Sequence, residues 1–135
     1  MGVDSNLLAE DFTPNPISLL ESNRNLGYSI EEAISDLIDN SISADSTKIS
    51  YEFHWNEGTP YFLLKDNGHG MSNEKNELIN SFRLGSTNPL EERDPRDLGR
   101  FGFGMKTASL SQARVLTVIT KKEGYATLAR SLDLN

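Results

Sequence analysis

The sequence predicts an α+β domain in which helices cover one face of a mostly antiparallel, mixed sheet. Segments with helical periodicity alternate with paired apolar runs along the chain, and no repeat or low-complexity tract interrupts them. Each pair of apolar runs is joined by a short turn, which is typical of antiparallel strands. With 135 residues, the chain is long enough for one domain with its own core.

The first half of the chain contains two expected helices and two expected strands. A short helix at about 17–24 follows two prolines and ends at Gly27. Ser29 and Glu32 form a capping box that opens a longer helix, at about 30–43. Strands are expected at about 48–55 and 61–65, joined by a turn at 56–60.

The second half repeats this alternation around a long polar segment. A helix is expected at about 73–82, followed by a loop at 83–100, which has charges, prolines and glycines but no apolar period. A helix at about 101–111 and strands at about 114–121 and 125–132 complete the domain.

Composition limits the possible functions. The chain has no cysteine, no long apolar run and no secretory signal, so we expect a soluble, cytoplasmic protein without a membrane partner. Its net charge of -7 argues against direct nucleic-acid binding. An anionic ligand would have to be held by backbone amides, helix ends and a bridging cation.

The helix at about 30–43 carries the first candidate site residues. Its apolar positions form one stripe on a helical wheel. Asp36 and Asn40 lie at the edge of this stripe, one turn apart. A polar group there can face a cleft, although an ordinary solvated position is the simpler interpretation.

The stretch DNGHGM, residues 66–71, is the second candidate. Asp66 ends an expected strand and, by alternation with Phe62 and Leu64, points toward the helices. A carboxylate only accepts hydrogen bonds, so it suits the amino group of adenine and not the carbonyl of guanine. Gly68 and Gly70 allow sharp turns and leave room for a flat ring. The alternatives are a plain glycine turn and, for His69, an exposed imidazole.

The stretch GRFGFGMKTASL, residues 99–110, is the third candidate, because its glycines precede a helix and can direct amides at phosphate. It is not a P-loop, since Met105 separates Gly104 from Lys106, nor a dinucleotide fingerprint, since Thr107 replaces the third glycine. Lys106 is either a phosphate contact or a surface lysine.

Together, EEAISDLIDNSISA, DNGHGM and GRFGFGMKTASL resemble, in order and spacing, the motifs of the GHKL ATPase superfamily, which has the Bergerat fold and includes gyrase B, Hsp90, histidine kinases and MutL. The resemblance covers residues 25–134. Within the superfamily, the loop and the final strands look most like MORC-type and related bacterial Hsp90-like ATPases.

This resemblance implies ATP and Mg²⁺ as ligands. It makes Asn40 the Mg²⁺ ligand, Asp36 the general base and Asp66 the adenine-binding acid, with segment 83–100 as the ATP lid. The remaining implied nucleotide contacts are Gly68, Gly70, Met71, Gly99, Gly102, Phe103, Gly104, Met105, Lys106 and Thr120. For Thr120, a structural role in its strand is the competing interpretation.

Two departures from the family pattern predict slow hydrolysis. Asp36 stands where a glutamate is usual, and the shorter side chain places the base about 1.5 Å further from its water. Ser43 replaces a common acid. The lysine that hydrolysing members usually take from a following domain is also missing, so we expect an N-terminal fragment of a longer protein. Lid closure is expected to couple ATP to a conformational change or to homodimerisation.

Two alternatives to an ATPase module remain. A non-catalytic ATP/ADP sensor fits the shortened base. A histidine-kinase catalytic domain is disfavoured, because only about 25 residues precede the first motif and an acid at Asp36 suits water activation.

Overall fold

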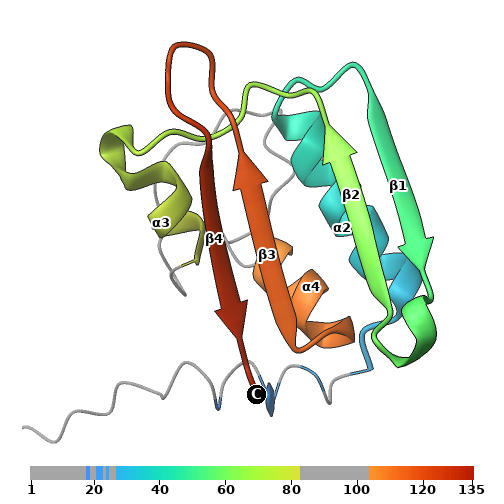
Figure 1. Ribbon diagram of the computed structural model, residues 1–135. Coiled ribbons are helices and arrows are strands. Elements are labelled where there is room, and N and C mark those ends of the chain that lie inside the picture. Colours follow the sequence, from blue (N-terminus) through green and yellow to red (C-terminus); the bar gives the residue numbers. More distant parts are fainter. Residues whose placement is uncertain (1–17, 19–20, 23, 25–26, 83–103) are drawn as a thin grey trace, which may run out of the picture.

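The computed structural model describes residues 18, 21–22, 24, 27–82 and 104–135. Four strands lie side by side in one layer, and helices α2 (Ile30–Ser43) and α4 (Gly104–Gln112) lie behind them (Figure 1). This arrangement confirms the α+β class and the placement of these two helices on one face. The lid segment 83–100 and the start of the expected final helix, 101–103, lie outside the described residues.

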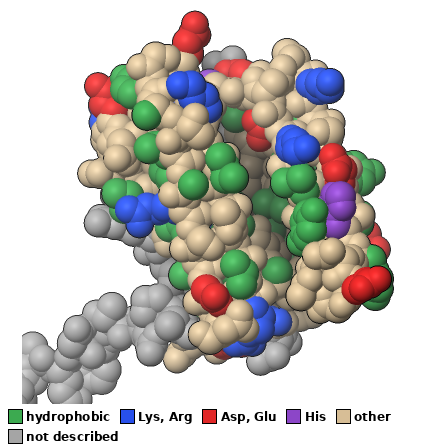
Figure 2. Space-filling view, in the orientation of Figure 1, with side chains coloured by type: hydrophobic (Ala, Val, Ile, Leu, Met, Phe, Trp, Pro, Cys, Tyr) green, Lys and Arg blue, Asp and Glu red, His purple; other side chains and the backbone are tan. Residues whose placement is uncertain are grey.

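The strands form two antiparallel hairpins. β1 (Ile49–His54) pairs with β2 (Tyr61–Asp66), and β3 (Val115–Thr120) pairs with β4 (Leu128–Asp133). Each hairpin is a separate two-stranded sheet in the described part of the chain, whereas the sequence predicts a single mixed sheet. The space-filling view shows a recess along the line between the hairpins (Figure 2). A loop contact described below joins the end of β3 to the chain that follows β2.

Helix α2 begins as its sequence predicts. Ser29 Oγ accepts from the Glu32 amide at 3.2 Å, and Glu32 Oε2 accepts from the Ser29 amide at 2.8 Å. The helix ends at Ser43, followed by Ala44 as its C-cap and by Asp45 with a φ of 58°. Ala33 and Ser41 are buried.

The segment after β2 differs from the expected helix at 73–82. A short 3₁₀ turn, η2 (Glu74–Asn76), precedes α3 (Glu77–Phe82), and both Lys75 and Asn76 have a φ of 55°. Non-glycine residues adopt this left-handed conformation at a cost, so tertiary contacts must hold the break. β4 also starts three residues later than expected, at Leu128.

The small core lies between the β3–β4 hairpin and the helices. Leu110 of α4 and Leu134 are buried, and Leu116 and Leu132 pack against them. In the part of the chain that is described, no helix has the length and hydropathy needed to cross a bilayer.

Candidate nucleotide site

Asp66 connects the end of β2 to α2. Ser41 Oγ donates to Asp66 Oδ2 at 2.9 Å, and the Gly68 amide donates to Asp66 Oδ1 at 2.9 Å. The contact with α2 confirms that the carboxylate points toward the helices. A carboxylate has about four lone-pair positions. These two bonds fix its orientation and leave capacity for a further donor.

The chain after Asp66 packs closely against the end of α2. The His69 amide donates to the Ala44 carbonyl at 2.9 Å. A Cβ on Gly68 would lie 2.7 Å from Ala44 Cβ and from Ser46 Oγ, so glycine is required for this approach. On that side of Gly68, protein atoms occupy the space in which the sequence predicts room for a flat ring. His69 is exposed, as its simpler interpretation predicts, and the described residues contain no cluster able to hold a metal through three His, Cys, Asp or Glu side chains.

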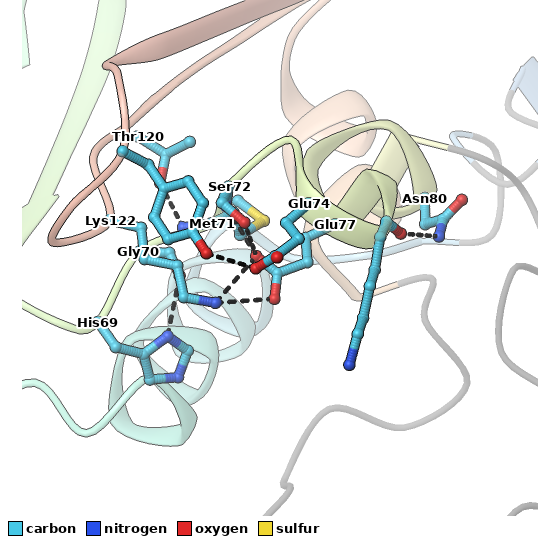
Figure 3. A network of polar contacts seen from close by, with 11 residues as sticks. His69, Gly70, Met71, Ser72, Glu74, Glu77, Asn80, Thr120 and Lys122 are labelled. Carbon is cyan, nitrogen blue, oxygen red and sulfur yellow. Dashed lines mark hydrogen bonds and ion pairs between the residues drawn. The ribbon is translucent and has the colours of Figure 1, made fainter.

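The loop then meets the β3–β4 hairpin, as Figure 3 shows. The Met71 amide donates to Thr120 Oγ1 at 2.8 Å. Gly70 has a φ of +67°, and a Cβ there would come within 2.1 Å of the Lys121 carbonyl oxygen. Thr120 is buried and therefore has the structural role foreseen for it. Its hydroxyl can still donate a hydrogen bond, and contact with a nucleotide stays a prediction.

Asp36 lies partly buried on α2, and it accepts a hydrogen bond from a residue that belongs to none of the three sequence motifs. Tyr28 OH donates to Asp36 Oδ2, and Gln112 Nε2 at the end of α4 donates to the Tyr28 carbonyl at 2.8 Å. Burial raises the pKa of Asp36, and the nearby Asp39 carboxylate raises it further. Asp36 borders a surface depression of about 360 Å³ lined also by Tyr28, Glu31, Glu32 and Ser35.

Asn40 has an incompletely satisfied amide. Its Nδ2 is buried and finds no hydrogen-bond partner among the described residues. A half-turn of the amide exchanges nitrogen and oxygen, which would put a carbonyl oxygen at this buried position. Because Mg²⁺ prefers oxygen ligands, the side chain fits the predicted metal role.

Lys106 in the first turn of α4 is fully buried, with 0 % of its surface exposed. Burial lowers the pKa of its ammonium group to about 8. The interpretation as a surface lysine is therefore wrong. Met105 beside it is half-buried and Gly104 begins the helix. The other predicted contacts in this motif, Gly99, Gly102 and Phe103, lie outside the described residues.

The order of these elements, with polar residues on α2, an acid closing β2 and a glycine-led helix α4, is that of a GHKL-type ATPase domain. The chain belongs to the family described as "Histidine kinase-, DNA gyrase B-, and HSP90-like ATPase", which matches residues 28–135. Membership implies the Bergerat fold.

Curated relatives agree with this assignment. The chain is 28% identical over 111 residues to ATPase morc-1 of Caenorhabditis elegans, covering 82% of this chain and 12% of that protein. It is 37% identical over 93 residues to DNA mismatch repair protein MutL of Thermosipho melanesiensis, covering 67% of this chain and 16% of that protein. It is 33% identical over 96 residues to ATPase MORC2B of Mus musculus, covering 67% and 9%. The chain thus spans less than a fifth of each relative.

Proposed function

We propose that this domain binds ATP with Mg²⁺ at residues of α2, the loop after β2 and the start of α4, and that it hydrolyses ATP slowly. The observation that carries the proposal is the setting of Asp66. Two donors orient this carboxylate, and it keeps lone pairs for a third. An acceptor that is held in one orientation at the end of β2, beside α2, suits the adenine amino group.

The chain's own residues divide the work. Asp66 accepts from the base, and Met71 and Thr120 border it. As the sequence motif predicts, the phosphates are bound by Lys106 and by amides of the glycine motif, which includes Gly99, Gly102, Phe103, Gly104 and Met105. Asn40 holds Mg²⁺, which when bound neutralises phosphate charge.

Asp36 takes a proton from the attacking water. Its raised pKa makes it a better proton acceptor than an ordinary aspartate. The donation from Tyr28 OH acts in the opposite direction, because a hydrogen bond to a carboxylate stabilises its charge. This contact and the short side chain support a slow reaction.

Segment 83–100 keeps its sequence-based assignment as the ATP lid. We propose that its closure couples nucleotide binding to a conformational change or to association of two domains. The similarity of this chain to MORC and MutL ATPases supports this proposal. Coupling of this kind is a property of a longer protein, and we propose that this chain is part of one.

A nucleotide sensor without turnover is the second candidate, and the Tyr28 contact with Asp36 favours it. Phosphate release and nucleotide binding measured on the same sample separate the two. Release that Asp36→Ala abolishes while binding persists supports the ATPase. Binding without release supports the sensor.

Calorimetric titration with ATP tests the base assignment. Asp66→Asn replaces an acceptor by a donor-bearing amide, and we expect ATP affinity to fall by at least about tenfold. Asp133→Asn is the matched control, because Asp133 also closes a strand but lies on the other hairpin. Equal affinity in the Asp66 variant and the wild type would remove the assignment.

The same titration with and without Mg²⁺ tests the metal ligand. Asn40→Ala should remove the dependence of ATP affinity on Mg²⁺. A variant with the Mg²⁺ titration of the wild type would show that another residue holds the metal.

A further inference from the structure

Three consecutive residues of the loop after β2 lie next to three consecutive residues of the β3–β4 hairpin. Gly70 lies against the carbonyl of Lys121, and the amide of Met71 binds Thr120. Ser72 and Lys122 both donate to one carboxylate, that of Glu77 in the first turn of α3 (Figure 3).

Glu77 accepts from both donors of a buried residue. Ser72 is 0 % exposed, and its amide and hydroxyl donate to Glu77 Oε2 at 2.7 and 3.0 Å. Lys122 Nζ approaches the same carboxylate at 2.9 and 3.2 Å. Buried donors without a partner are costly, so removal of the carboxylate would leave two donors of Ser72 and one cation to find others.

The backbone is bent to make this contact. Lys75 and Asn76 both adopt left-handed conformations just before Glu77. The break in the expected helix brings the Glu77 carboxylate back onto Ser72, which lies five residues earlier. A second contact of the same segment, Tyr125 OH to the Glu74 carboxylate, also reaches the hairpin but does not reach the loop.

The contacts of Glu77 with Ser72 and Lys122, which we call the Glu77 clamp, lie at the end of the loop that is away from Asp66. The near end is already fixed by Ser41 and Ala44 of the α2 region. Glu77 therefore controls the stretch that contains Met71, which we expect to border the base. A loop fixed at both ends holds its acceptor and its apolar contact in one geometry, and selectivity depends on such preorganisation.

We propose that Glu77 is a positioning residue that holds the base-binding loop in its adenine-reading form and so sets nucleotide affinity and base selectivity. The inference rests on the proposed function. Glu77 does not touch the reacting atoms in this account. Its loss should raise KM for ATP and reduce the preference for ATP over GTP, with little change in kcat.

The test compares Glu77→Ala, Glu77→Gln and Lys122→Met with the matched control Glu74→Gln. Calorimetry with ATP and with GTP should show ATP affinity about tenfold weaker and a smaller ATP/GTP ratio in Glu77→Ala. Glu77→Gln keeps one acceptor for Ser72 and should be intermediate. Glu74→Gln should stay within about twofold of the wild type.

Amide hydrogen exchange without nucleotide gives an independent readout. Ser72 and Met71 should lose protection in Glu77→Ala and keep it in Glu74→Gln. Should Glu77→Ala fail to fold, Lys122→Met and Glu77→Gln decide, because each weakens only one side of the clamp.

Three results would overturn the inference. The first is wild-type affinity and ATP/GTP ratio in the Glu77 and Lys122 variants. The second is an equal loss in the Glu74 control. In both, the wild type binds ATP and the proposed function stands. The third is a wild type that binds no ATP, which overturns the proposed function and this inference together.

Discussion

Replacement of Lys106 by methionine should stabilise the free domain while weakening its hold on ATP. The ammonium group is fully buried in α4, and burial lowers its pKa from 10.5 to about 8. At about 1.36 kcal/mol per pKa unit, this difference corresponds to about 3 kcal/mol against the charged form, and we take about 2 kcal/mol to allow for the interaction that this buried side chain makes. The methionine side chain of the variant would carry no such cost, and its volume is similar.

The pH dependence gives the sign of the effect. Because the folded pKa lies below the unfolded value, the unfolded chain binds the extra proton between pH 8 and 10.5. The penalty on the wild type is therefore complete below about pH 8 and disappears as the pH rises toward 10.5. The advantage of Lys106→Met should follow the same window.

Denaturant unfolding at pH 7 measures this directly. We expect the free energy of unfolding to rise by about 2 kcal/mol in Lys106→Met without nucleotide, and Tm by about 6 °C. With Mg²⁺ and ATP the wild type should gain stability and the variant should gain less, because a ligand stabilises only the state that binds it. Lys65→Met is the control, since its side chain is 60% exposed and its change should stay within about 0.5 kcal/mol.

Two results would refute this reasoning. A variant less stable than the wild type at pH 7 would mean that the polar neighbours of the ammonium group outweigh the cost of its burial. Equal stabilisation of variant and wild type by ATP would mean that Lys106 does not contact phosphate.

Three further predictions concern single contacts. Tyr28→Phe removes the hydrogen bond that weakens Asp36 as a base, so it should raise kcat for ATP hydrolysis by about tenfold in single-turnover phosphate release. ATP affinity, measured by calorimetry, should stay within about twofold, and parallel changes in both would show a structural role only. Gly68→Ala should destabilise the domain by about 2 kcal/mol in denaturant unfolding, because the added Cβ meets the end of α2 at 2.7 Å, and an unchanged midpoint would contradict that packing. The Ser72 amide and Lys122 lower the pKa of Glu77 to about 2, so its contribution to stability is complete above pH 4.5 and is lost as the pH falls toward 2; Glu77→Gln should therefore lose less stability than the wild type over that range.

Local patterns predicted the elements that local interactions determine. The capping box of Ser29 and Glu32 correctly places the start of α2, and the alternation of Phe62, Leu64 and Asp66 correctly predicts that the acid faces the helices. These signals depend on residues a few positions apart, which is why the sequence contains them.

Contacts between distant segments were not predictable in this way. The helix expected at 73–82 is interrupted at Lys75 and Asn76. After the interruption, Glu77 contacts Ser72 and also Lys122, which lies 45 positions further along the chain. The Tyr28 contact with Asp36 follows no motif, although a tyrosine just before a helix with an acid on its edge is a signal worth testing. The role of Gly68 also needed the fold, because its neighbour is the end of α2.

A crystal structure of this chain with Mg²⁺ and a non-hydrolysable ATP analogue tests the central claim most directly. The account predicts that the adenine amino nitrogen lies within about 3.2 Å of an Asp66 carboxylate oxygen. A bound base far from Asp66 would contradict it.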